Sequence, residues 1–238
     1  MLVRWDEIRV GQEDKLEEIF ALYDQSFPYD VREPHEILLC GLEYPKFNAP
    51  NQFHLLAGYV GDRLLAFAAF HYLAEVNTGF IVYLATSPES RGLGIGTKAL
   101  EKIEAILESD ALQAGNAALA TIVLETEQPE FVFTEWEKED CIKRNRFYER
   151  NGYVKRQDIP YLQPPLHKGE EGIPLVLCVK TLRNIVMTPE KMRAIIESIY
   201  HEKYDLVNGI SKQVLQSCLE KMKSKRIKRE VFTNECCN

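Results

Sequence analysis

The sequence has no apolar run long enough to cross a membrane. A transmembrane helix needs about 18 consecutive apolar residues, and no stretch of this 238-residue chain reaches that length. The first residues, MLVRWDEIRVGQEDK, are charged early and lack the apolar segment of a secretory signal. We therefore expect a cytoplasmic protein with no membrane partner.

Paired metal-binding cysteines are also missing. The six cysteines form no C-x-x-C pair, and no histidine stands at zinc-finger spacing from two of them. The sequence therefore predicts no metal site. Scattered cysteines without an export signal are typical of reduced thiols, and Cys40, Cys141 and Cys178 are expected to be small buried side chains.

Positive charge is not in excess. The chain has 29 Lys and Arg against 36 Asp and Glu, a net charge of −7. That balance does not favour binding along a phosphate backbone, and the basic run at 221–229 is more typical of a solvated helix end. We predict no nucleic-acid partner.

Periodicity predicts a mixed α/β domain over residues 1–184 and a helical extension over 185–238. Gly61 and Asp62 separate two apolar strands as a tight hairpin turn would. The predicted elements, in chain order, are a strand at 2–9, helices at 13–27 and after Pro34, strands at 53–60, 63–73 and 78–86, a helix at 97–107, a strand at 118–125, a helix at 137–151, strands at 153–157 and 174–181, and a long structureless loop between these last two.

The extension carries two amphipathic stripes. Met192, Ile195 and Ile199 share one face of a helix, and Val214 and Cys218 belong to a second stripe. An apolar stripe has to be buried. It packs either within this chain or on a second subunit, so a homodimer stays open.

A glycine-rich turn follows the strand at 78–86. Its sequence is RGLGIGTK, and a helix begins at its end. Lysine would follow the last glycine of a Walker A motif, and a dinucleotide-binding turn would need glycine at position 97; Thr97 fits neither. Glycines before a helix N-terminus still form an anion cradle. The pattern predicts a phosphate-binding turn of another kind.

At these residues the sequence resembles the GCN5-related N-acetyltransferase (GNAT) family, in which R/Q-x-x-G-x-G/A binds the pyrophosphate of acetyl-coenzyme A. A second stretch, RFYERNGY at 146–153, resembles the end of the family's fourth helix. The resemblance covers residues 1 to about 183. It implies an α/β fold with a central, mostly antiparallel, twisted sheet flanked by helices. It also implies acetyl-coenzyme A as co-substrate, contacted by Leu84, Ala85, Thr86, Arg91, Gly92, Leu93, Gly94, Ile95, Gly96 and Thr97.

The resemblance also implies catalytic residues. Tyr148 matches the family tyrosine that donates a proton to the sulfur of coenzyme A. Cys141, Arg144, Asn145 and Tyr148 share one helical face. Family members often carry Asn and Ala where this chain has Cys141 and Arg144, and Asn145 is the candidate substitute for the pantetheine contact.

The general base is less directly indicated. Leu124-Glu125-Thr126 resembles the L-E-V element of ribosomal-protein N-terminal acetyltransferases, so Glu125 is the first candidate to deprotonate the amine, acting through water. Burial would have to raise its pKa for work near pH 7. His71 and Glu75 are the alternatives.

The sequence thus predicts an enzyme that transfers an acetyl group from acetyl-coenzyme A to a primary amine of a small molecule or peptide. In this fold the acceptor is selected by the loop at 26–33 and the proline-rich stretch at 160–174. A longer acyl donor remains open. The alternative from another class is a non-catalytic coenzyme A sensor or partner-binding module.

Overall fold

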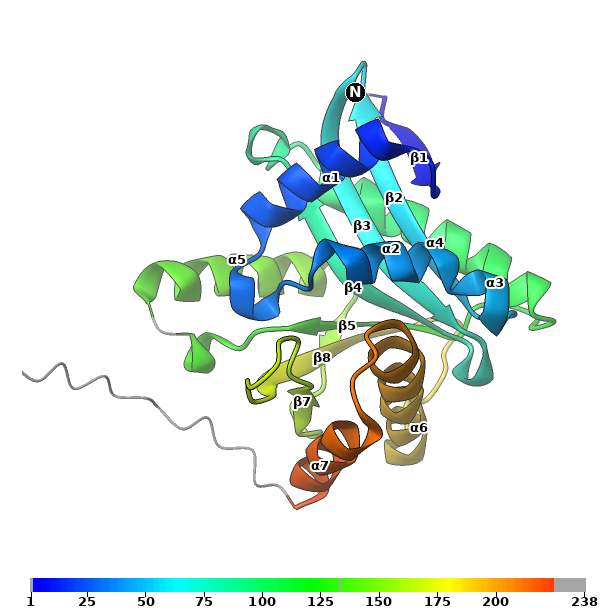
Figure 1. Ribbon diagram of the computed structural model, residues 1–238, viewed down its shortest axis with the longest axis vertical. Helices are drawn as coiled ribbons and strands as arrows, with labels where there is room; N and C mark the ends of the chain where they lie inside the picture. The colour runs from blue at the N-terminus through cyan, green and yellow to red at the C-terminus, as the bar shows by residue number, and fades with distance from the viewer. Residues whose placement is uncertain (1, 133, 225–238) are drawn as a thin grey trace, which may run out of the picture.

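A strongly twisted sheet forms the centre of residues 2–132 and 134–224, the part that the computed structural model describes (Figure 1). Its strands run in the order β1-β2-β3-β4-β5-β8-β6, and β7 pairs with β8 outside this path. β4 and β5 are parallel, and all other neighbouring pairs are antiparallel. The mixed α/β prediction is therefore confirmed. The strands are β1 (Arg4–Ile8), β2 (Gln52–Val60), β3 (Arg63–Leu73), β4 (Thr78–Thr86), β5 (Thr121–Thr126), β6 (Val154–Lys155), β7 (Tyr161–Gln163) and β8 (Ile173–Thr181).

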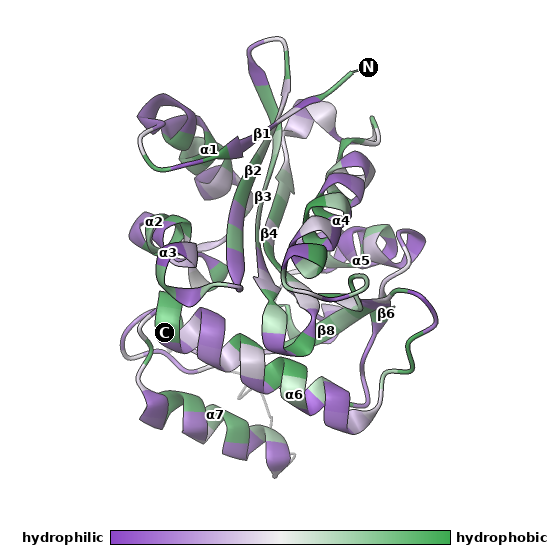
Figure 2. Cartoon of the chain, turned by 90° about the vertical axis from the view of Figure 1, so that its right-hand side faces the viewer, coloured by the Kyte–Doolittle hydropathy of each residue, from purple (hydrophilic) through white to green (hydrophobic). Residues whose placement is uncertain are grey.

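Helices cover both faces of the sheet. Figure 2 shows the sheet between α1, α2 and α3 on one side and α4 and α5 on the other. None of the helices in the described ranges is long and apolar enough to cross a membrane. Their bounds are α1 (Glu13–Ser26), α2 (His35–Glu43), α3 (Pro45–Asn48), α4 (Ile95–Gln113) and α5 (Glu135–Arg150), with short 3-10 turns η1 (Tyr29–Val31), η2 (Ala74–Val76), η3 (Pro88–Ser90) and η4 (Pro129–Phe131).

The central strands are apolar on both faces because each face has its own core. Along β3, Phe67 and Ala69 pack in the cluster under α1 and α2, while Ala68 and Phe70 pack in the cluster under α4. Alternate side chains of a strand point to opposite faces. The nearly unbroken apolar runs read in the sequence therefore belong to strands buried on both sides.

β4 and β5 pair over only part of their length. Residues 78–81 of β4 pair with residues 121–124 of β5. The β3–β4 register then shifts, so that Val82 has no partner residue on β3. Such a bulge bends a strand and increases its twist. Beyond it, β4 and β5 separate and leave a gap in the middle of the sheet, where the site described below lies.

The C-terminal segments pack against the same sheet. They are α6 (Pro189–Ile199), the π-helix η5 (Tyr200–Val207) and α7 (Lys212–Lys223). Met192, Ile195 and Ile199 share a core cluster with Phe80 of β4 and Val123 of β5. The first predicted stripe is thus buried within this chain. The basic run reaches residue 229, and its part from residue 225 on lies outside the described residues.

Three local predictions were wrong. The connection after residue 157 is not structureless, because β7 pairs with β8 within it. The helix predicted from Thr97 begins at Ile95 and runs to Gln113. Cys40 is exposed, since α2 turns Leu38 and Gly41 inward instead, whereas Cys141 and Cys178 are buried as predicted.

Candidate active site

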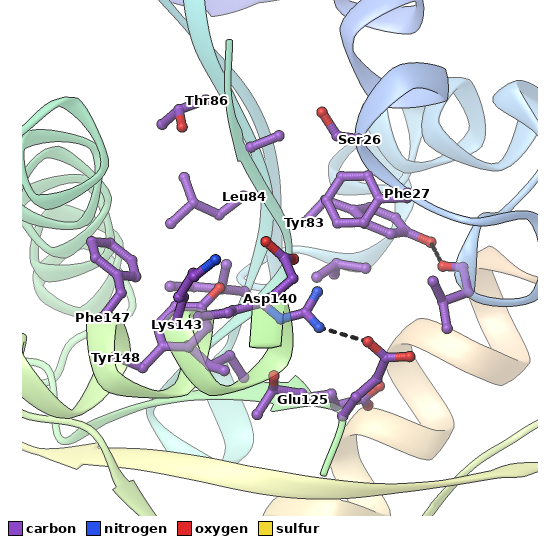
Figure 3. A pocket seen from close by; sticks show the side chains of 18 of the residues that line it. Ser26, Phe27, Tyr83, Leu84, Thr86, Glu125, Asp140, Lys143, Phe147 and Tyr148 are labelled. Carbon is purple, nitrogen blue, oxygen red and sulfur yellow. Dashed lines mark hydrogen bonds and ion pairs between the residues drawn. The ribbon is translucent and has the colours of Figure 1, made fainter. Parts of the chain in front are cut away.

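A cavity of about 410 Å³ occupies the gap between β4 and β5. Figure 3 shows Tyr83, Phe27 and Ser26 on one side of it, Phe147 and Tyr148 of α5 on the other, and Glu125 at its base. A second hollow of about 360 Å³ adjoins it along α4 and α5. The two share Leu84, Thr86, Arg91, Gly92, Arg144, Phe147 and Tyr148. Together they form one continuous path past Tyr148.

The second hollow is suited to an anion. Gly92 and Gly94 have φ angles of +77° and +74°, which side chains other than glycine rarely adopt, and the space beside their Cα atoms is open. No side chain caps the first N–H groups of α4, which begins directly after Gly94. Arg91 and Arg150 add positive charge to the lining. Free N–H groups, a helix N-terminus and guanidinium groups together form a phosphate site. These residues fit the diphosphate of coenzyme A.

α4 and α5 come into close contact beside this hollow. A Cβ atom on Gly96 would lie 3.0 Å from the ring of Phe147. Glycine at this position therefore lets Phe147 pack directly against the start of α4. The side chains that α5 turns to the cavity are at positions 140, 143, 144, 147 and 148, a single helical face.

The exit of β4 offers backbone donors to the cavity. Leu84, Ala85 and Thr86 line it at the point where β5 no longer pairs with β4. Alternate N–H groups of a strand point to opposite edges, so this edge of β4 presents unpaired N–H groups. Such groups polarise a carbonyl when its oxygen lies against them.

Tyr148 stands where the two hollows meet. Its side chain is 8% exposed, and its hydroxyl has no hydrogen-bond partner within the described part of the chain. Burial raises the pKa of Tyr148 to about 12, and the nearby charge of Arg144 limits the shift. The phenol is therefore protonated at neutral pH and can donate its proton into the path.

Glu125 is held by three donors at the base of the cavity. The hydroxyl of Tyr161 donates to Oε1, the Gln163 amide donates to Oε2 over 2.9 Å, and the hydroxyl of Tyr204 lies 2.9 Å from both oxygens. Burial raises the pKa of Glu125 to about 7, and these three donors, which stabilise the charged form, oppose the shift. A carboxyl group with that pKa accepts and releases a proton near neutral pH.

The two loops that the sequence predicts to select the acceptor contact each other. The rings of Tyr29 in η1 and His167 in the β7–β8 loop are stacked with their centroids 4.1 Å apart. Nε2 of His167 also lies 3.0 Å from the carbonyl oxygen of Tyr29. The two loops therefore touch each other through residues that lie outside the lining of the cavity.

Most residues singled out in the sequence line this path. Its lining includes Leu84, Ala85, Thr86, Arg91, Gly92, Gly94, Ile95, Gly96, Thr97, Glu125 and Tyr148. Leu93 lies in neither hollow and is 58% exposed. Asn145 also lines neither; its amide contacts Thr126 and the Glu127 carbonyl. The alternative bases lie outside as well, and His71 is fully buried with no hydrogen-bond partner for either ring nitrogen among the described residues.

Sequence reasoning missed the partners of Glu125. Tyr161 and Gln163 come from β7, where the sequence predicts a loop, and Tyr204 comes from the C-terminal extension. The alternation of Tyr161 and Gln163 around Leu162 was the available signal, because alternate residues of a strand share a face. Asp140 and Lys143 of α5 also line the cavity without having been predicted.

Comparisons with known proteins bear on the fold and on the first half of the sequence. Residues 16–123 match the profile of the Acetyltransferase (GNAT) family. No curated protein sequence matches the chain. A candidate GNAT-family acetyltransferase from Bacteroides thetaiotaomicron has a similar structure, with a TM-score of 0.61, 24% identity, and coverage of 87% of this chain and 99% of that one.

A candidate acetyltransferase from Salmonella typhimurium, solved with its cofactor acetyl-CoA, gives a TM-score of 0.50 at 12% identity and covers 79% of this chain and 98% of its own. Identities this low establish the fold alone. The family profile matches the sequence itself, over a range that includes β4 and the glycine turn. Residues 16–123 therefore resemble the Acetyltransferase (GNAT) family, and the fold agrees with that resemblance.

Proposed function

We propose that this protein transfers an acetyl group from acetyl-coenzyme A to the primary amine of a small molecule or peptide, by direct attack. One observation carries the proposal. A carboxyl group with a pKa near 7, Glu125, and a protonated phenol, Tyr148, face the same cavity, which continues into a phosphate-binding turn.

Each residue has one task in this reaction. Acetyl-coenzyme A supplies an activated acetyl group, and its thiolate is the leaving group. Backbone N–H groups at Leu84 to Thr86 donate to the carbonyl oxygen. Glu125 takes a proton from the incoming ammonium group, directly or through water, so that the nitrogen lone pair can bond to the carbonyl carbon. Tyr148 gives its proton to the sulfur as the carbon–sulfur bond breaks. The newly bonded nitrogen then returns a proton to Tyr148, and Glu125 releases its proton to water.

The acceptor end favours a group that donates hydrogen bonds. Gln163 lines the cavity, and its Oε1 is buried with no partner in the described residues. Its Nε2 donates to Glu125, so the amide orientation is set by the carboxylate. A carboxylate and a free amide oxygen together suit an ammonium or amine.

The first test is binding followed by transfer. At about 100 times its dissociation constant, acetyl-coenzyme A stabilises the folded state by about 2.7 kcal/mol. For a chain of this size the melting temperature rises by about 5–11 °C. Thiol release and acetylated product are then measured together over a panel of small amines and short peptides. Binding without product from any amine supports the sensor alternative and contradicts the proposal.

Gly94→Val removes the melting-temperature increase with acetyl-coenzyme A, because valine closes the turn and strains its backbone. Gly61→Val is the matched control. Gly61 also has a positive φ and open space beside it, but it lies in the β2–β3 turn, away from the site. We expect Gly61→Val to lower the basal melting temperature and to keep the full ligand response. Equal responses of the two variants would contradict the assignment of the cradle.

Tyr148→Phe lowers kcat at least about 100-fold, the usual contribution of a general acid, while acetyl-coenzyme A still raises the melting temperature. Tyr153→Phe is the control, since Tyr153 packs against the Tyr148 ring and is buried but lines neither hollow. Steady-state kinetics on both variants give the comparison. A Tyr148→Phe enzyme with wild-type kcat would remove the phenol from the mechanism.

A further inference from the structure

The C-terminal extension reaches the acceptor end of the site through one π-helix. In η5 the backbone is wider than in an α-helix, and such segments often occur at functional sites because they redirect side chains. Two consecutive residues of η5, Lys203 and Tyr204, are each 1% exposed. Both lie beyond residues 16–123, which match the family profile.

Tyr204 forms hydrogen bonds with Glu125 itself. Its hydroxyl lies 2.9 Å from each carboxyl oxygen, and the amide of Gln163 lies 3.4 Å from the same hydroxyl. A carboxylate has about four acceptor positions. Tyr161, Gln163 and Tyr204 supply one hydrogen each, so one position is left for the proton of an incoming amine.

Lys203 fixes η5 to the opposite wall. Its Nζ lies 2.7 and 2.8 Å from the carboxyl oxygens of Glu33 and 2.7 Å from Asn208. The Glu33 N–H lies 3.2 Å from the hydroxyl of Tyr83, which lines the cavity. The buried ion pair thus ties η5 to the loop after α1 and holds Tyr204 in place.

We propose that Tyr204 is a positioning residue for Glu125, so that the C-terminal extension forms part of the acetyl-transfer site. The inference rests on the proposed function. Tyr204 acts through Glu125: its hydroxyl orients the carboxylate and stabilises the charged form that accepts the proton.

Three titratable groups of the described residues face Glu125. They are Tyr161 of β7, Tyr204 of η5 and, further away, Glu33, which is paired with Lys203. Burial and the charge of Glu125 raise the pKa values of Tyr161 and Tyr204 well above the usual range. Both hydroxyls therefore stay protonated. The acid limb of the pH profile, where kcat/KM rises with pH, therefore reports the ionisation of Glu125.

Tyr204→Phe moves that acid limb upward by about one pH unit, because a hydrogen bond to a charged group is lost. We expect kcat/KM to fall about tenfold at pH 6 and to recover at high pH, where Glu125 is ionised in both enzymes. A merely structural role would lower activity equally at every pH. The measurement is kcat/KM for one amine between pH 5.5 and 9.5.

Tyr200→Phe is the matched control. Tyr200 begins the same π-helix, is buried, and donates its hydroxyl to the Leu162 carbonyl rather than to Glu125. We expect the acid limb of the Tyr200→Phe enzyme to stay at the wild-type position. If Tyr204→Phe does not fold, 3-fluorotyrosine placed at position 204 keeps the shape and strengthens the donor, and the limb moves downward.

The outcomes separate the two proposals. If the wild-type enzyme is active but the acid limb does not move in the Tyr204 variants, the role of Tyr204 is overturned and the proposed function stands. A wild-type protein that acetylates no amine overturns the proposed function. An upward shift in Tyr204→Phe with none in Tyr200→Phe establishes the positioning role.

Discussion

Glu125→Gln lowers kcat/KM for amine acetylation by about 10²–10⁴, the range for loss of a general base. The amide keeps the size of the side chain and removes the group that takes the proton. The pKa of Glu125 is raised to about 7 by burial, so the wild-type rate rises with pH through about 7 as the carboxyl group ionises. In the variant that rise is absent. Initial rates between pH 5.5 and 9.5 measure both effects.

Glu75→Gln is the control for this experiment. Glu75 was the other candidate carboxylate in the sequence, and it lies in η2, outside the lining of the cavity. We expect the Glu75→Gln enzyme to keep the wild-type pH profile and the wild-type kcat/KM. A Glu125→Gln enzyme with an unchanged acid limb would show that another group takes the proton. Unchanged binding of acetyl-coenzyme A in both variants excludes misfolding as the cause.

The phosphate-binding turn was predictable because it is local. Strand, glycine turn and helix follow one another within residues 78–113, and short-range sequence determines each of them. Glu125 was predicted from the resemblance of Leu124-Glu125-Thr126 to a short family element, and that segment forms the end of β5. In both cases one contiguous segment carries the signal.

The environment of Glu125 was not predictable in the same way. Its partners come from positions 36, 38 and 79 residues further along the chain. β7 has three residues, too few for a clear alternation, and the π-helix η5 interrupts the 3.6-residue period on which the prediction of the extension depended. The raised pKa therefore needs the three-dimensional structure.

The rotation of α5 is a second such case. The spacing of Cys141, Arg144, Asn145 and Tyr148 correctly places them near one another, but a helical face has no fixed direction until the helix packs. Packing of Phe147 against Gly96 sets that direction. Arg144 and Tyr148 then line the cavity. Cys141 and Asn145 do not, and each donates a hydrogen bond to the Glu127 carbonyl.

Lys203→Met destabilises the protein by about 3–5 kcal/mol, because it leaves Glu33 buried without its cation. Both side chains of the pair are almost fully buried, at 2% and 1% exposure. For a chain of this size the melting temperature falls by about 6–20 °C. Thermal and urea unfolding at pH 7 measure the loss.

Two further variants show whether the buried charge is the cause. Lys212→Met removes a lysine that is 85% exposed and 3.9 Å from Asp205, and an exposed pair of this kind contributes about 0–1 kcal/mol. Glu33→Gln combined with Lys203→Met removes both charges and regains most of the stability, as neutral replacements of buried pairs do. A double variant as unstable as Lys203→Met would mean that packing of the lysine stem, and not its charge, holds η5 against the loop. Tyr204 follows Lys203 directly, so the double variant also tests whether the ion pair is needed for the action of Tyr204 on Glu125. If the double variant regains stability and its kcat/KM rises with pH as in the wild type, the ion pair anchors η5 and is not needed for that action.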